Sequence, residues 1–183
     1  MSLRLSGGRR LKSPPGSLAR PTPARVRLAM MNLLAGELAG CRWLDLCSGS
    51  GAMACEALQR GADQVVAVER DRRLAAVTRA NLQAVQGGLE RQTQVAVHAA
   101  EVVRWLQQAN GAEGFELIYA DPPYAAGLYG PMAAAVASGH WLRAGGTLIW
   151  VCGRGAVPAV PDCWRERDRR RYGSTSVLRL RRP

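Results

Sequence analysis

The chain has 183 residues, of which 48% are hydrophobic and 21% are charged, and its formal net charge is +11. This length and composition are typical of one compact globular domain and argue against a disordered or fibrous chain. No apolar run reaches the roughly 20 residues that span a bilayer, and the first residues do not resemble a signal peptide. We therefore expect a cytoplasmic protein with no membrane partner.

The cysteines give no sign of a disulfide framework or a metal site. Their number is odd, no two of them form a C-x-x-C pair, and the chain has only two histidines. Structural zinc sites need four such ligands at regular spacing, so we expect no metal and mostly buried, reduced thiols. The five cysteines are Cys41, Cys47, Cys55, Cys152 and Cys163.

The positive charge is concentrated at the two ends of the chain. Residues 1–36 contain seven basic residues and no acidic one, and residues 163–183 contain eight arginines against two acidic residues. Basic side chains that neutralise phosphates dominate nucleic-acid affinity, so these ends predict a polyanion-binding surface. An arginine-rich genome could produce the same pattern, because Lys12 is the only lysine in the sequence.

The N-terminal region divides into an arm and a helix. Residues 1–21 are rich in Gly, Pro and Arg, which predicts a basic arm or a short hairpin around Gly7-Gly8, outside the core. A helix is expected to follow, with Thr22 as its N-cap and Pro23 at its first helical position. Apolar residues then recur at helical spacing until Gly40 ends the helix.

From residue 42 onward, short β-rich apolar runs alternate with helical segments. This alternation predicts an α/β domain over residues 22–183, with a doubly wound, mostly parallel sheet covered by helices on both faces. The tail predicts a C-terminal β-hairpin over residues 164–171 and 175–181. The other expected strands are 42–47, 64–69, 92–97, 115–120 and 146–152, and the expected helices are 52–60, 72–86, 100–109 and 128–139.

A glycine-rich turn predicts a cofactor site after the first expected strand. That strand runs into Ser48-Gly49-Ser50-Gly51, and a helix opens at Ala52. Glycines at the carboxyl end of a parallel strand let the backbone approach a ligand closely. Because Ala54 completes a G-x-G-x-x-G/A pattern, a dinucleotide competes for this interpretation, and Glu69 would suit the ribose hydroxyls of either ligand.

Asp45 favours S-adenosylmethionine over a dinucleotide. Its carboxylate lies four residues before the first glycine, where it can face the cationic amino-acid end of that cofactor but would repel a pyrophosphate. Glu101 is placed to accept a hydrogen bond from an adenine amine, although an acid there could simply begin the helix 100–109. The expected cofactor-binding residues are Asp45, Gly49, Ser50, Gly51, Glu69 and Glu101.

The most specific motif is Asp121-Pro122-Pro123-Tyr124, directly after a buried strand. An exocyclic amine on a nucleobase is a poor nucleophile because its lone pair is delocalised into the ring. The Asp121 carboxylate and the Pro122 carbonyl could hold its two N–H groups and turn the lone pair toward a methyl group, and successive prolines would fix that carbonyl in place. Tyr124 offers an aromatic face for a base taken out of its stack.

Together these motifs resemble the RsmD family, which methylates guanine N2 in 16S ribosomal RNA, and the similarity runs from about Leu3 to Arg181. The resemblance implies a class I methyltransferase fold, S-adenosylmethionine as cofactor, and a partly or fully assembled small ribosomal subunit as substrate. We expect a monomer that binds RNA through Arg9, Arg10, Lys12, Arg20, Thr22, Arg25 and Arg27. The matching positions are Arg20-Pro21-Thr22, Arg25-Val26-Arg27, Asn32, Asp45, Gly49-Ser50-Gly51-Ala52, Glu56-Ala57, Arg60-Gly61-Ala62, Glu69, Asn81-Leu82 and Asp121-Pro122-Pro123-Tyr124.

Two other functions stay open at this point. The Asp-Pro-Pro-Tyr motif alone does not distinguish a guanine amine from an adenine or cytosine amine, so another RNA or DNA could be the substrate. The chain has no room for a separate DNA target-recognition domain, which argues against DNA. A non-catalytic RNA-binding assembly factor on a methyltransferase scaffold is also compatible with the sequence, because Cys47-Ser48 and Glu101 depart from the family's usual residues.

Overall fold

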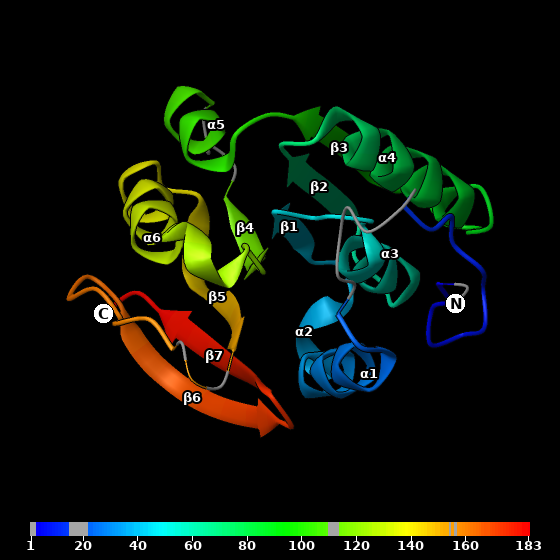
Figure 1. Ribbon diagram of the computed structural model, residues 1–183. Coiled ribbons are helices and arrows are strands. Elements are labelled where there is room, and N and C mark those ends of the chain that lie inside the picture. Colours follow the sequence, from blue (N-terminus) through cyan, green and yellow to red (C-terminus); the bar gives the residue numbers. More distant parts are fainter. Residues whose placement is uncertain (1–2, 15–21, 110–113, 154, 156) are drawn as a thin grey trace.

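The computed structural model describes residues 3–14, 22–109, 114–153, 155 and 157–183. Within these residues, seven strands form one sheet in the order β3-β2-β1-β4-β5-β7-β6 (Figure 1). The first five strands pair in parallel, and β7 lies antiparallel between β5 and β6. The predicted doubly wound sheet and C-terminal hairpin are confirmed. The strands are β1 (Arg42–Leu46), β2 (Gln64–Glu69), β3 (Gln94–Ala99), β4 (Phe115–Ala120), β5 (Leu142–Gly153), β6 (Arg165–Tyr172) and β7 (Thr175–Arg181).

Helices cover both faces of the sheet. Because side chains alternate along a strand, Trp43 of β1 packs with residues of α1, α3 and α4 on one face, whereas Leu44 and Leu46 pack with α5 and α6 on the other. Figure 1 shows these two groups of helices on opposite sides of the strands. The helices are α1 (Ala24–Leu33), α2 (Ala35–Leu38), α3 (Ala52–Gln59), α4 (Arg72–Gln86), α5 (Val102–Gln108) and α6 (Tyr129–Ser138), with a 3-10 turn η1 (Tyr124–Ala126).

The first helix differs from the prediction in two ways. It is divided into α1 and α2 at Leu34, whose φ of −96° and ψ of 4° depart from helical values. The expectation that Thr22 is the N-cap is wrong, because Pro23 holds that position and no side chain caps the helix. The Thr22 hydroxyl has a different partner, described below.

Residues 3–14, the described part of the N-terminal segment, form the short hairpin that was one of the two expected forms. Arg4 pairs with Arg10 in an isolated antiparallel bridge, and Gly8 at the turn has a φ of +84°, which favours glycine. The expectation that this segment lies outside the core is wrong for three leucines of residues 3–14, which face the helical layer. The buried leucines are Leu3, Leu5 and Leu11.

Three cysteines, Cys41, Cys55 and Cys152, are buried, and Cys163 is exposed. In the part of the chain that the structure describes, histidine, cysteine and acidic side chains do not gather in groups of three or more that could hold a metal ion. Among the helices described, none combines the length and the apolar character needed to cross a membrane.

Candidate active site

The glycine-rich turn and the Asp-Pro-Pro-Tyr motif meet at the carboxyl edge of the sheet. Neighbouring parallel strands β1 and β4 end level with each other, since Leu46 is in register with Ala120. Burial raises the pKa of the Cys47 thiol to about 12, and the negative charges of Glu69, Asp45, Asp121 and Glu101 raise it in the same direction. All four acidic residues predicted for the site are therefore near enough to this turn for their charges to act on it.

The turn after β1 depends on left-handed backbone conformations. Cys47, Gly49 and Gly51 have φ values of 64°, 57° and 73°, a region that non-glycine residues adopt at an energetic cost. A Cβ atom on Gly51 would lie 2.7 Å from the Cγ2 atom of Thr78, so this glycine is also required for packing. The backbone at Gly51 therefore lies close to α4. The sequence alone had indicated only that this glycine lets the backbone approach a ligand.

Two side chains of α4 donate hydrogen bonds to the backbone of the same turn. The Thr78 hydroxyl donates to the Gly49 carbonyl at 2.8 Å, and the Asn81 amide donates to the Ser50 carbonyl at 3.0 Å. Asn81 also donates to the Lys12 carbonyl and accepts from the Lys12 N–H at 2.7 Å. The Asn81 side chain therefore connects the N-terminal hairpin to the glycine-rich turn.

Asp45 is fully buried beside α3. Its Oδ2 atom accepts a hydrogen bond from the Ala54 N–H at 3.0 Å, and its buried Oδ1 atom has no hydrogen-bond partner among the described residues. Burial raises the pKa of Asp45 well above its ordinary value, the charge of Asp121 raises it further, and the Ala54 bond opposes both. A desolvated carboxylate oxygen without a partner fits a cationic group, as the ammonium of S-adenosylmethionine would be.

The other two predicted cofactor acids have backbone partners. Glu69 accepts from the Gly49 N–H at 2.9 Å and from the Asp71 N–H at 2.8 Å, which fixes the turn against the end of β2. Glu101 accepts from the Val103 and Arg104 N–H groups and is the N-cap of α5. Glu101 therefore begins the helix, as the alternative interpretation of this residue expected. Its contact with an adenine amine stays a prediction.

Asp121 receives two hydrogen bonds on one oxygen. Its Oδ2 atom accepts from the Thr22 hydroxyl at 2.9 Å and from the Tyr119 hydroxyl at 3.2 Å. Burial raises the pKa of Asp121, and these two bonds act in the opposite direction. Thr22 was expected to contact RNA, and Tyr119 was not predicted at all. Tyr119 could have been found, because it lies two residues before Asp121 on the same face of β4, in register with Asp45.

The Tyr124 side chain is exposed to solvent. Its ring lies over the end of β5, since a Cβ atom on Gly153 would be 3.1 Å from Tyr124 Cδ2, and 46% of the residue is exposed. Pro122 is buried, and the Pro123 carbonyl accepts from the Ala126 N–H at 2.9 Å, which closes the turn η1. The motif is therefore a compact turn with its aromatic ring accessible.

Most of the predicted RNA-binding residues are exposed at the N-terminal side of the molecule. Arg9 also donates to the Ala84 carbonyl at 2.9 Å, so its stem is held against α4. Arg20 lies outside the described residues. The exposed members of the set are Arg9, Arg10, Lys12 and Arg25.

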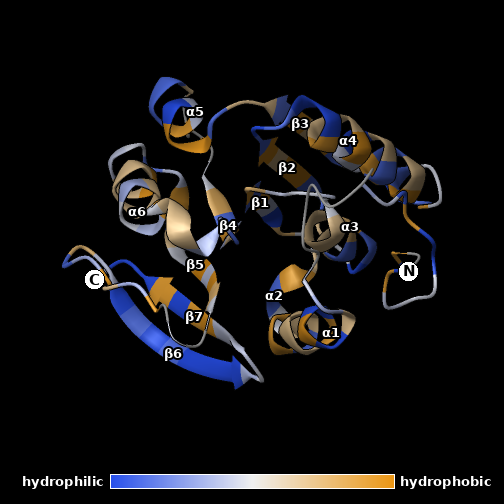
Figure 2. Cartoon of the chain, viewed as in Figure 1, coloured by the Kyte–Doolittle hydropathy of each residue, from blue (hydrophilic) through white to orange (hydrophobic). Residues whose placement is uncertain are grey.

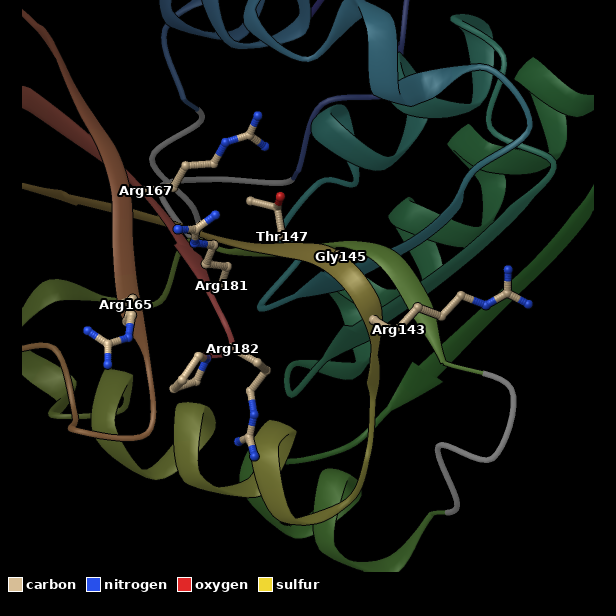
Figure 3. Close-up of a pocket in the computed structure, with 10 residues that line it drawn as sticks. Arg143, Gly145, Thr147, Arg165, Arg167, Arg181 and Arg182 are labelled. Atoms are coloured by element: carbon tan, nitrogen blue, oxygen red, sulfur yellow. The ribbon is translucent and has the colours of Figure 1, made fainter.

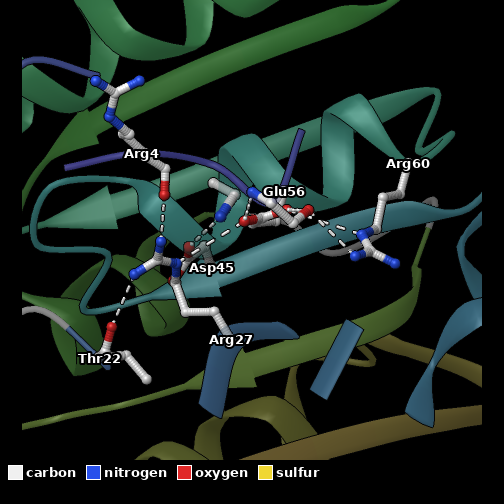
Figure 4. Close-up of polar contacts among 8 residues, drawn as sticks. Arg4, Thr22, Arg27, Asp45, Glu56 and Arg60 are labelled. Atoms are coloured by element: carbon white, nitrogen blue, oxygen red, sulfur yellow. Dashed lines mark hydrogen bonds and ion pairs between the residues drawn. The ribbon is translucent and has the colours of Figure 1, made fainter. Parts of the chain in front are cut away.

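Arg27 is a correction to the predicted RNA-binding set. Its residue is only 3% exposed, and its guanidinium donates to the backbone carbonyls of Thr22 and Arg4 (Figure 4). Its Nε atom lies 3.9 Å from Glu56, which in turn accepts from the Ser6 N–H at 2.8 Å and from the Ser6 hydroxyl at 2.6 Å. Arg27 and Glu56 therefore join the hairpin to α1 and α3, and this guanidinium is not available to a phosphate.

Replacing Asp45 by Asn is expected to weaken S-adenosylmethionine binding by about 1–3 kcal/mol, the scale of a charge-assisted hydrogen bond. The amide keeps the size of the side chain but removes the charge that would hold the ammonium group. Calorimetric titration with S-adenosylmethionine measures this change. Glu90→Gln, at an exposed position, is the control. Equal affinity in the two variants would show that Asp45 does not contact the cofactor.

Known proteins match this chain over most of its length. The family model described as conserved hypothetical protein 95 matches residues 5–181. Ribosomal RNA small subunit methyltransferase D of Escherichia coli strain K12 is 31% identical over 159 residues, which are 86% of this chain and 76% of that protein. YlbH of Bacillus subtilis, described as a candidate rRNA methyltransferase, is 37% identical over 118 residues, which are 64% of this chain and 62% of that protein.

A solved structure agrees with these relatives. The Escherichia coli protein yhhF, described as a candidate methyltransferase, has a TM-score of 0.82 and 26% identity, with 100% of this chain and 98% of that chain covered. The similarity extends over the whole sheet, including the antiparallel β7. The chain therefore belongs to the RsmD family, and its fold is that of the class I S-adenosylmethionine-dependent methyltransferases.

Proposed function

We propose that this protein transfers a methyl group from S-adenosylmethionine to the exocyclic N2 amine of a guanine in small-subunit (16S) ribosomal RNA. The observation that carries this proposal is that the Asp-Pro-Pro-Tyr motif and the glycine-rich turn begin at the same edge of the sheet, where Leu46 of β1 and Ala120 of β4 are in register. The name of the Escherichia coli relative, a small-subunit rRNA methyltransferase, supports this choice of substrate. We further propose that the protein acts as a monomer on a partly or fully assembled subunit.

The acidic residues at the ends of β1 and β2 would hold the cofactor. S-adenosylmethionine supplies an electrophilic methyl group on a sulfonium sulfur. Asp45 has a buried oxygen that an ammonium group would satisfy, and Glu69 lies at the strand end where a ribose is expected. The turn of Gly49, Ser50 and Gly51 is fixed by α4, so its backbone is organised before any ligand binds.

Asp121 and Pro122 would prepare the amine for attack. An ionised carboxylate only accepts hydrogen bonds, so Asp121 can hold one N–H group while the Pro122 carbonyl holds the other. The lone pair of the nitrogen is then directed out of the ring plane. When the new C–N bond forms, the nitrogen must lose a proton, and Asp121 is placed to take it. Its raised pKa makes it a better proton acceptor than an ordinary aspartate.

Tyr124 would stabilise the guanine after it leaves its stack. Enzymes that act on bases take the base out of the stack, and an aromatic side chain can replace part of the stacking that is lost. The exposed ring over Gly153 can serve this purpose without any movement of the motif. We therefore expect the Tyr124 ring to stack on the flipped base, and we expect the Tyr124 hydroxyl not to be required for methyl transfer.

The N-terminal hairpin would connect RNA binding to the catalytic carboxylate. Arg9, Arg10, Lys12 and Arg25 present positive charge on the surface, where they can contact phosphates. Thr22 lies between the hairpin and α1, and its hydroxyl bonds directly to Asp121. RNA held by the hairpin would therefore lie close to the site of methyl transfer.

Methyl transfer from labelled S-adenosylmethionine tests the proposed function. Small subunits, large subunits and DNA from cells lacking the protein are offered in parallel, and we expect label in the RNA of the small subunit. Label in DNA or in large-subunit RNA would favour the alternative amino-methyltransferase. No binding of S-adenosylmethionine by the purified protein would favour the non-catalytic assembly factor.

Replacing Thr22 by Val is expected to move the acid side of the pH–rate profile to higher pH. The Thr22 bond lowers the pKa of Asp121, so its loss raises that pKa further, and the ionised carboxylate is then lost at a higher pH. Thr22→Ser keeps the hydroxyl and should leave the profile unchanged. Single-turnover rates across the acidic range provide the measurement. A rate that falls by the same factor at every pH would reduce Thr22 to a structural role.

A further inference from the structure

A groove of about 720 Å³ lies at the edge of the sheet opposite to the methyl-transfer site. It is formed by the beginning of β5 and by the ends of the C-terminal hairpin that are far from its turn (Figure 3). At the start of β5, Leu142 is in register with Phe115 and Thr147 with Leu117, whereas Asp121 follows the end of β4. Four to six residues of strand therefore separate the two levels, which is roughly 13–20 Å at about 3.3 Å per residue. The lining residues are Arg143, Ala144, Gly145, Gly146, Thr147, Arg165, Arg167, Arg181, Arg182 and Pro183.

Positive charge in this arginine groove is not neutralised as it is elsewhere on the hairpin. Arg169 pairs with Glu166, and Arg179 pairs with both Asp168 and Glu37. The lining includes no acidic side chain, and within the described segments Arg165, Arg181 and Arg182 form no salt bridge. The two remaining groove arginines do have acidic neighbours, since Arg143 pairs with Glu116 and Arg167 lies 3.9 Å from Glu37.

The unpaired arginines are also placed against one another. Arg165 and Arg181 are direct cross-strand partners in the pairing of β6 with β7, and like charges in that position destabilise a hairpin. Arg182 lies over the ring of Trp164 at 5.7 Å. The three guanidinium groups line one groove but point in different directions (Figure 3), which suits an anion with acceptor oxygens at several places along its length.

The edge strand β6 connects the arginine groove to the methyl-transfer edge. It is hydrophilic along its whole length (Figure 2), and it carries arginines from the groove to the hairpin turn at Gly173. At that turn Arg25 of α1 lies close by, because a Cβ atom on Gly173 would be 3.4 Å from the Arg25 guanidinium. Between the groove and this turn, Arg169 and Arg170 have acidic neighbours in Glu166 and Asp168, whereas Arg171 forms no salt bridge within the described residues. A row of arginines therefore leads from the groove to the N-terminal surface, with its charge partly neutralised on the way. An extended polyanion fits this arrangement better than a small ion does.

We propose that the arginine groove binds the phosphates of the RNA backbone. It would be a second RNA contact, at the edge of the sheet opposite to the methyl-transfer site. This inference rests on the proposed function, because it assumes that the substrate is RNA. The groove would hold a helix or strand of the ribosomal RNA at a distance from the methylated guanine. It would therefore contribute to affinity and orientation and not to the chemical step.

The test is RNA binding by a variant in which Arg165, Arg181 and Arg182 are all changed to Gln. Three lost phosphate contacts should reduce the salt dependence of binding by about 2 log units in affinity per log unit of salt, at about 0.7 for each phosphate of a single strand. The loss of affinity should therefore be about 100-fold larger at about 0.1 M salt than at about 1 M salt. Filter binding of a 16S rRNA transcript measures the slope. The matched control carries the same change at Arg72, Arg73 and Arg104, three exposed arginines on α4 and α5.

Two further measurements separate the possible outcomes. At saturating RNA, the groove variant should transfer methyl at the rate of the unaltered protein and should bind S-adenosylmethionine normally. If the unaltered protein methylates RNA but the groove and control variants have the same salt dependence, the groove assignment is wrong. It is equally wrong if the groove variant keeps that salt dependence and self-associates, since the arginines would then serve to protect an edge strand. If the unaltered protein binds RNA but methylates none, the proposed function fails, and the difference in salt dependence alone decides whether the groove binds RNA.

Discussion

Replacing Asp121 by Ala is expected to reduce single-turnover methyl transfer on the order of 10² to 10³ fold, as the loss of one preorganised oxyanion-hole donor does in other enzymes. The change removes one of the two acceptors proposed to hold the guanine amine and the group placed to take its proton. Binding of the small subunit should hardly change, because the RNA backbone is proposed to be held by the hairpin residues and not by Asp121. Rates are measured with enzyme in excess over subunits from cells lacking the protein.

Thr22→Val provides the matched control for this experiment. Both variants lose the hydrogen bond between Thr22 and Asp121, but only Asp121→Ala loses the carboxylate. The difference between them therefore reports the chemistry. S-adenosylmethionine affinity should not fall in Asp121→Ala, because the charge of Asp121 raises the pKa of Asp45 and so disfavours the ionised form that binds a cation. Equal rates for Asp121→Ala and Thr22→Val would contradict the proposed role of the carboxylate.

Replacing Glu56 by Ala is expected to lower the free energy of unfolding by about 3–5 kcal/mol, the scale for removing one partner of a buried ion pair. Glu56 is only 1% exposed, and its loss leaves the buried Arg27 guanidinium without its nearby carboxylate. It also leaves the Ser6 N–H and hydroxyl without their acceptor. Urea unfolding followed by circular dichroism measures the loss.

The N-terminal hairpin should respond more strongly than the sheet does. Glu56 also lies 3.8 Å from Arg60, whose guanidinium donates to the Ser6 hydroxyl, so one carboxylate organises the contacts of the hairpin with α3. We therefore expect faster proteolysis within the hairpin of Glu56→Ala. Glu90→Ala, at an exposed position, should change stability by less than about 0.5 kcal/mol. If both variants unfold at the same urea concentration, Glu56 does not hold the hairpin.

The sequence predicted the strands and turns that carry the two motifs well because its signals are local. The strand before Asp121 is a continuous apolar run, and the glycines after β1 directly follow another, so strand, turn and helix could each be identified from a few neighbouring residues. Parallel pairing of β1 with β4 then brings both motifs to one edge. Nothing beyond the alternation of strands and helices was needed for this part of the site.

The contacts that support the site were not predictable in the same way. Thr22 and Asp121 are 99 residues apart, and the sequence around Thr22 is equally consistent with a helix cap. Arg27 lies in a basic segment, so a surface position is the natural expectation. In the structure Arg27 is buried, and its guanidinium donates to two backbone carbonyls and lies near Glu56. Such partners are brought together by packing of the whole chain, and no local pattern records them.

The central claim is that the methyl group is transferred to the N2 amine of a guanine in small-subunit RNA. The most direct test is single-turnover transfer of an isotopically labelled methyl group into small subunits from cells lacking the protein, followed by digestion and mass analysis of the labelled nucleoside. We expect a single product, N2-methylguanosine, which is absent when the Asp121→Ala variant is used for the same short reaction time. A methyl group on a ring carbon or on a ribose would contradict the amine mechanism derived from Asp121, Pro122 and Tyr124.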